Sequence, residues 1–403
     1  MSPSVSELLN VIVRWVHLIA GIMWIGNSML FNWLDRNLEL PPDPKPGLVG
    51  EIWMVHSGGF YSVEKKFLQP SAMPQTLHWF KWQNGITWMS GIVLLVLVYY
   101  LGGAAYMVDP AVSNVSPYAA VGIGVGALVV AWLLYDLVWR SPLGKRPTLA
   151  FILSLAVVVG ISAVFFRVMS GRAAYMHVGV MLGTIMTGNV WFCILPSQRE
   201  LVAATKEGRE QNPAIGYQAK QRSIHNNYIT FPLLFIMLSN HFPTTFGNAL
   251  NWVVLLVLAI GSAAIRHLMN IRFTYRRWLL PATVAFFASA VAAWFLMAHP
   301  TGFRRATEMR RLTLTRHVPF EEAQSVVRQR CVSCHSAHPT SPAFPVAPLG
   351  IMFDTAEQMH RLAPRIRVRT WELRSMPLAN MTGMNDGERD VLAAWVDQGA
   401  HTP

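Results

Sequence analysis

The segment Cys331-Val-Ser-Cys334-His335 has the C-x-x-C-H spacing by which c-type haem is attached to proteins. In this chemistry the two thiols form thioethers with the haem vinyl groups, and the adjacent imidazole ligates the iron. A zinc site is the alternative, but it needs about four ligands, and the third cysteine, Cys193, lies in an apolar run. The pattern therefore predicts one covalent haem c held by Cys331, Cys334 and His335.

A sixth iron ligand is expected downstream of this motif, where methionine is the usual ligand in an electron-transfer cytochrome. The candidate methionines are Met376, Met381 and Met384. Met376 is favoured because Pro377 follows it and fixes an extended loop, and Met384 is the next choice. Two further candidates, which the spacing favours less, are His338 and His360.

A second group of candidate ligands lies in the apolar runs. Arg14, His17 and Gly21 are spaced by three and four residues, so they share one face of a helix. On that face an arginine can pair with a haem propionate and a glycine leaves room for a flat cofactor, which makes His17 a candidate ligand of a non-covalent haem b. The candidate partner ligands are His177 and His241. The alternative, a histidine that a neighbouring helix satisfies, remains open.

Other polar residues gather at the ends of apolar runs, on the side of the membrane that the charge distribution below assigns to the cytoplasm. Ionisable groups at membrane depth are functional candidates by default, although histidines at helix ends are often only interfacial. Their clustering on one side is more informative than any one of these residues. The candidate residues are His56, His225, His267, Arg266, Asn226, Asn227 and Asn270.

The elements that must position these residues are apolar runs of about twenty residues, the length that crosses a bilayer. Hydrophobic residues make up 53% of the 403-residue chain and charged residues only 13%, which indicates an integral membrane protein. The net charge of +12 lacks the interleaved basic and aromatic residues of a nucleic-acid interface, so no nucleic-acid partner is expected. Eight candidate spans are found, at 7–34, 77–101, 117–139, 149–167, 175–196, 224–240, 249–269 and 279–298.

Lysine and arginine are unevenly distributed between the connections. They concentrate in 35–76, 140–148, 197–223 and 266–278, whereas 102–116, 167–174 and 241–248 contain only Arg167 and Arg172. The positive-inside rule places the first set in the cytoplasm, so both termini are expected outside it. No cleavable signal peptide is expected, because the N-terminus lacks a basic region and a cleavage site before the first run.

The composition changes after residue 298. We predict a transmembrane domain at 1–298, an arginine-rich linker at 299–318 and a small cytochrome c domain at 319–403. The last domain is expected to have one helix from about Phe320 to Arg330 and another from about Asn385 to Asp397, with a proline-rich loop between them. The predicted fold class is all-α: a polytopic bundle of about eight transmembrane helices plus this domain.

Over essentially its whole length the sequence resembles the integral-membrane, cytochrome-c-linked urate oxidases, also called urate hydroxylases. Order and spacing both agree, apart from Ser57, where the family pattern has glycine. The first helix is also similar, over a short stretch, to the membrane protoporphyrinogen oxidases. The residues that carry the main resemblance are Arg14–His17, Trp24–Gly26, Val55–Tyr61, Thr87–Gly91, His225–Tyr228, Ser239–Pro243, Arg266–His267, the haem motif and Met376–Asn380.

The resemblance implies oxidation of urate to 5-hydroxyisourate in purine breakdown, without peroxide. Electrons would pass to haem c and then to a soluble cytochrome or a terminal oxidase. It also implies a bacterial inner membrane location, with the termini and the cytochrome domain in the periplasm. Two alternatives are a dehydrogenase of quinol or another small molecule with a cytochrome tail, and a non-catalytic membrane electron conduit.

Overall fold

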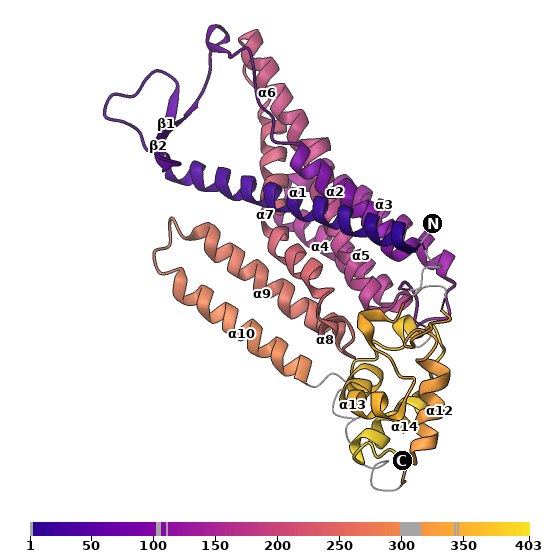
Figure 1. The fold of residues 1–403 in the computed structure, drawn as a ribbon. Helices are drawn as coiled ribbons and strands as arrows, with labels where there is room; N and C mark the ends of the chain where they lie inside the picture. The colour runs from indigo at the N-terminus through magenta and orange to yellow at the C-terminus, as the bar shows by residue number, and fades with distance from the viewer. Residues whose placement is uncertain (1–2, 102–105, 110–111, 299–315, 342–343, 345) are drawn as a thin grey trace.

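The computed structural model describes residues 3–101, 106–109, 112–298, 316–341, 344 and 346–403. In the part before residue 299, α1 crosses the central helices obliquely, while α9 and α10 lie side by side at one edge (Figure 1). Two π-helical segments, η2 (Val96–Tyr100) and η4 (Val190–Ile194), continue α2 and join α5 to α6. The α-helices of this part are α1 (Pro3–Asn37), α2 (Trp82–Leu95), α3 (Pro117–Arg140), α4 (Pro147–Val168), α5 (Gly171–Asn189), α6 (Leu195–Glu207), α7 (Pro213–Ser239), α8 (Pro243–Phe246), α9 (Asn251–Ile271) and α10 (Leu279–Ala298).

Local sequence explains where several of these helices begin. α3, α4 and α7 each have proline at the first position, where the missing N–H costs nothing. Ser116, Ser170 and Asn212 precede α3, α5 and α7, and each side chain accepts a hydrogen bond from a backbone N–H of the first turn. These caps fix where α3, α5 and α7 begin.

Seven helical segments in the described part of the chain are long and apolar enough to cross a bilayer. They correspond to seven of the eight predicted spans, and the chain is a membrane protein. The eighth, 224–240, lies in α7, which is long enough but too polar, because its first half carries Lys220, Arg222, His225 and two asparagines. The predicted all-α polytopic bundle is confirmed, with α7 as a more polar helix beside the seven apolar spans.

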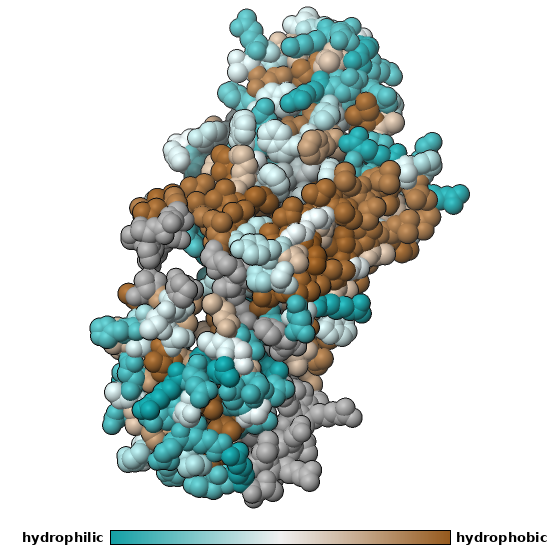
Figure 2. Space-filling view, turned by 90° about the vertical axis from the view of Figure 1, so that its right-hand side faces the viewer, coloured by the Kyte–Doolittle hydropathy of each residue, from teal (hydrophilic) through white to brown (hydrophobic). Residues whose placement is uncertain are grey.

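Apolar side chains form a band across the middle of the molecule, with hydrophilic surface above and below it (Figure 2). The surface above the band lies at the end where α6 and the start of α7 project (Figure 1). Within the bundle, a buried core includes Phe165, Tyr175, Met181 and Ile185. The apolar outer faces of the helices thus match a hydrocarbon environment.

The connection at 35–76 contains an antiparallel hairpin of β1 (Leu48–His56) and β2 (Gly59–Lys66), in which His56 pairs with Gly59. Ser57 and Gly58 form the two-residue turn, both with positive φ, as hairpin turns of this length require. The bundle is therefore helical as predicted, with this small sheet added to it.

The C-terminal part forms its own core around Val327, Met359, Leu392 and Trp395. The predicted helices are confirmed as α12 (Phe320–Arg330) and α14 (Asp386–Asp397), and Asn385 and Glu388 form a capping box on the latter. The prediction of loop between them was incomplete, because α13 (Ala356–Arg367) lies there, started by a capping box at Thr355 and Gln358. The predicted linker up to residue 315 lies outside the described residues.

Candidate functional site

The central polar motif of the bundle, His225–Tyr228, lies on α7 and faces two different neighbours. His225 and Asn226 contact α3 and α5, whereas Asn227 and Tyr228 contact α9. The structure therefore divides the predicted cluster into two polar networks. We call them the α3 network and the α9 network, after the helix that α7 faces.

The α3 network is closed by hydrogen bonds on all sides. Asn189 Nδ2 donates to the Tyr135 hydroxyl at 3.1 Å and to Asn226 Oδ1 at 2.9 Å. The Tyr135 hydroxyl lies 2.7 Å from His225 Nδ1. Because the hydroxyl accepts from Asn189, its own proton is available for Nδ1.

The buried arginine of the α3 network is paired with an acid. Arg222 is only 2% exposed and donates to Asp136 Oδ1 at 2.6 Å and to Asn189 Oδ1 at 3.2 Å. Its guanidinium also covers the Tyr135 ring, 4.7 Å from the centroid. A buried ion pair with additional hydrogen bonds can persist in an apolar interior, so this network is complete without a ligand.

The α9 network has a buried charge with no matching acid. Arg266 is 4% exposed, and its Nε donates to Asn227 Oδ1 at 3.0 Å, which also accepts from Asn270 Nδ2 at 2.7 Å. No carboxylate of the described residues forms a salt bridge with Arg266, and its guanidinium lies 5.2 Å from the centroid of the Phe231 ring. Because an uncompensated buried charge is costly, this arginine is suited to a bound anion.

A histidine stands directly beside this arginine. Exposed His267 follows Arg266 on α9, and its Nδ1 lies 2.6 Å from the Tyr228 hydroxyl, with the two rings stacked at 6.0 Å. The Tyr228 contact fixes the ring and leaves Nε2 as the second functional atom. The α9 network thus contains a cation, two amides and a histidine, the groups that hold a planar anionic heterocycle.

In the C-terminal part, the haem motif begins directly after α12. His335 Nδ1–H donates to the Ile351 carbonyl at 3.0 Å, which leaves Nε2 free for iron, as is usual for a ligating histidine. Burial and the neighbouring Cys334 raise the pKa of the Cys331 thiol to about 12. These residues fit the predicted haem c.

The loop with the predicted sixth ligand is anchored from two sides. The Met376 N–H donates to the Arg369 carbonyl at 3.0 Å, and the Met376 carbonyl accepts from the buried Arg389 at 2.8 Å. The Met376 side chain is half-buried, whereas Met384 is 2% exposed and belongs to the apolar core. A fixed backbone with a partly accessible thioether fits the role predicted for Met376, which stays a prediction.

The family model described as urate oxidase N-terminal matches residues 3–297. The chain belongs to this family. Both polar networks and all the candidate histidines of the bundle lie within the match, which indicates a urate-related oxidase function for the membrane part. No curated protein and no solved structure matches the chain.

Within the urate oxidase N-terminal region, the candidate haem b residues differ in their surroundings. The half-buried His17 has Nδ1 2.9 Å from the Thr87 carbonyl and 3.1 Å from Ser90 Oγ, so Nε2 remains available. His177 is fully buried. Its Nδ1–H donates a hydrogen bond to the Ala173 carbonyl, and its Nε2 lies 3.1 Å from the Tyr100 hydroxyl.

Of the remaining predicted residues, Arg14, His56 and His241 are exposed. His241 follows α7 at the surface, and Arg14 donates to Asn10 within α1. Gly21 faces α2, since a Cβ there would lie 3.8 Å from Thr87, so the space expected beside it is taken by that helix. His56 is exposed at the hairpin turn, and no hydrogen bond of the described residues joins it to either polar network.

Sequence reasoning missed residues on which both networks depend: Tyr135, Asp136, Asn189, Arg222 and Tyr228. Asp136 carried a usable signal, because an acid inside an apolar run requires a partner. Nothing in the sequence indicates that Arg222 is that partner. The sequence analysis placed it in the basic connection at 197–223.

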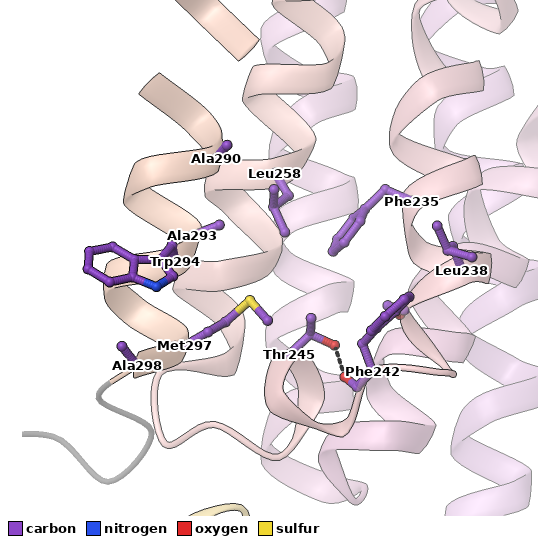
Figure 3. Close-up of a pocket in the computed structure, with 11 residues that line it drawn as sticks. Phe235, Leu238, Phe242, Thr245, Leu258, Ala290, Ala293, Trp294, Met297 and Ala298 are labelled. Atoms are coloured by element: carbon purple, nitrogen blue, oxygen red, sulfur yellow. Dashed lines mark hydrogen bonds between the residues drawn. The ribbon is translucent and has the colours of Figure 1, made fainter. Parts of the chain in front are cut away.

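The urate oxidase region also has an apolar cavity of about 500 Å³ between α7, α9 and α10, near α8 (Figure 3). Phe235, Phe242, Leu258, Trp294 and Met297 are among its lining residues. Its two hydroxyls, on Ser239 and Thr245, donate to backbone carbonyls, and none of its described lining residues is an acid or a histidine. The described lining therefore offers no proton acceptor, which quinol oxidation would need.

Proposed function

We propose that this protein oxidises urate to 5-hydroxyisourate and passes the electrons to haem c on its C-terminal part, and then to a soluble cytochrome or terminal oxidase. The match of residues 3–297 to the urate oxidase N-terminal family carries the proposal. The reaction adds the oxygen of one water to urate and releases two protons and two electrons. Because oxygen is not the electron acceptor, no peroxide forms.

The α9 network is the proposed urate site. Arg266 would bind the negative charge, and the amides of Asn227 and Asn270 would contact ring carbonyls and N–H groups. When His267 Nδ1–H donates to the Tyr228 oxygen, Nε2 carries the lone pair that a base needs. His225 and Asn226, in the closed α3 network, support α7 from the other side. His56 has no assigned role.

Haem c would be held by Cys331, Cys334, His335 and Met376. The bound group would supply a one-electron acceptor, so each urate requires two successive transfers. Gly247 follows α8 and lies against the carbonyl of Leu373, where a Cβ would clash. Leu373 is three residues before Met376, so the bundle lies close to the loop that is expected to carry the iron ligand.

The distance between the two sites favours a relay. Arg266 lies fifteen residues along α9 from Asn251, about 22 Å at 1.5 Å per residue, and α9 begins at the α8 end. Electron transfer slows steeply with distance, so we propose an additional haem b ligated by His17. Its Nε2 is available, whereas His177 would first have to lose its contact with Tyr100.

The proposed location is a bacterial inner membrane, with both termini and the cytochrome part in the periplasm. The uneven distribution of lysine and arginine between the connections supports this orientation. A reporter enzyme that is active only in the periplasm should be active when fused after residue 403. A reporter that is active only in the cytoplasm should be inactive at the same position.

The test is turnover of urate by purified protein in air with a soluble cytochrome c as acceptor. We expect 5-hydroxyisourate, reduced cytochrome and no peroxide. A variant with Cys331→Ala and Cys334→Ala should insert normally, carry no covalent haem and leave the acceptor oxidised. Stoichiometric peroxide from the wild type would contradict the proposal.

Met376→His tests the haem ligand separately. Replacing a thioether by imidazole should retain the covalent haem and lower its reduction potential. Redox titration measures this, with Met381→His, at an exposed site, as the control that should leave the potential unchanged. An unchanged potential in Met376→His would move the assignment to Met384.

A further inference from the structure

A second cavity, of about 270 Å³, lies where α3 ends, the α3–α4 connection begins and α7 starts. Its lining includes three basic side chains, Arg140, Lys145 and Arg222, and no acid. It shares no lining residue with the proposed urate site. We therefore considered what its charge and its position would bind.

The charge around this cavity is positive. Asp136 does not line the cavity, but its carboxylate accepts from Arg222 at 2.6 Å and from Arg140 at 2.6 Å. One carboxylate therefore pairs with two guanidinium groups. Lys145 is exposed and forms no salt bridge with any described residue. Three cations against one carboxylate leave the cavity suited to an anion.

The position of the cavity is that of a membrane surface. Arg140 is the last residue of one apolar span and Pro147 the first of the next, so the cavity lies at the level where two spans end. Trp139 and Tyr217 also line it, and such aromatic residues are enriched at the headgroup level. The anions concentrated at this level of a cytoplasmic leaflet are lipid phosphates.

An apolar stripe continues from the cavity into the span. Leu137 and Leu133 lie three and seven residues before Arg140, on the same face of α3, and are 63% and 57% exposed. A soluble anion would use only the basic mouth, whereas a phospholipid would use both the mouth and the stripe.

We propose that this cavity binds the phosphate of an anionic phospholipid, with Arg140 and Lys145 contacting the headgroup and Leu137 and Leu133 contacting an acyl chain. Because Arg140 and Arg222 share Asp136, the bound lipid stabilises the α3 network at its end. The inference is independent of the proposed urate oxidation.

The experiment compares the melting temperature of full-length protein in nanodiscs of phosphatidylcholine alone and with phosphatidylglycerol. Binding to the folded state raises the melting temperature, so the anionic discs should stabilise the wild type. Lys145→Gln should lose most of this increase and bind the anionic lipid about fivefold more weakly, since one basic residue contributes about that factor at a membrane surface.

Arg146→Gln is the matched control, because Arg146 is adjacent and exposed and does not line the cavity. It should retain the increase, and both variants should melt at the temperature of the wild type in phosphatidylcholine discs, which shows that they fold. Equal losses in the two variants, or no effect of phosphatidylglycerol on the wild type, would overturn the proposal. Full stabilisation by inorganic phosphate or by urate in phosphatidylcholine discs would overturn it too, in favour of a soluble anion.

Discussion

The two sides of α7 face similar polar residues, but the buried arginine on one side has an acidic partner and the buried arginine on the other side has none among the described residues. On the α3 side, Arg222 is buried with Asp136, and the hydrogen bonds close on themselves. On the α9 side, Arg266 is buried to nearly the same degree, and its described polar partner is an amide oxygen. We infer from this difference that the Arg222–Asp136 pair stabilises the bundle, whereas Arg266 serves the proposed urate site.

The largest effect is expected from breaking the balanced pair. Asp136→Leu leaves the buried Arg222 without its acid and should cost about 3–5 kcal/mol of stability. Arg222→Leu should cost less, because Asp136 keeps its ion pair with Arg140. The double variant should recover most of the loss, because neither charge remains. Thermal unfolding of the three variants in detergent checks this; equal losses in single and double variants would show that the pair itself is unimportant.

The opposite behaviour is expected at the unbalanced arginine. Arg266→Gln should leave the melting temperature equal or higher, since it removes an uncompensated charge, but should raise the KM for urate about tenfold or more. Arg272→Gln removes the same charge from the end of the same helix and should leave KM unchanged. A normal KM in Arg266→Gln would remove urate from the α9 network.

A smaller pair of effects comes from the two tyrosine–histidine contacts. Tyr135→Phe leaves buried groups of the α3 network without a partner and should cost about 1–3 kcal/mol of stability. Tyr228→Phe frees the exposed His267 ring and should lower kcat about fivefold at unchanged stability, an effect of about 1 kcal/mol. Unfolding and turnover measured on both variants separate the roles; a loss of stability in Tyr228→Phe with normal kcat would reverse them.

The sequence predicted the parts of this arrangement that depend on local pattern. Apolar runs predicted eight spans, seven of which are helices apolar enough to cross a bilayer, and the acidic start after Asn385 predicted α14. It missed α13, whose capping box at Thr355 was readable but stood in a proline-rich stretch. The hairpin turn at Ser57-Gly58 was equally readable as a two-residue turn.

The candidate site could be predicted by residue type but not by partner. His225, Asn226, Asn227 and Tyr228 are consecutive, and only the packing of α7 between two helices decides which pairs with which. The charge balance that distinguishes the networks depends on Asp136, which is far from Arg222 in sequence. Such pairings are set by tertiary contact, so a single sequence does not contain them.

The most direct test of the central claim is anaerobic mixing of purified, oxidised protein with urate while the haem c absorption is followed. The account predicts that one urate delivers two electrons, so that urate at half the haem c concentration reduces all of it when haem c is the final acceptor. Arg266→Gln should reach the same end point more slowly at low urate, and the cysteine double variant should show no haem c signal. Haem c that stays oxidised with excess urate in the wild type would contradict the account.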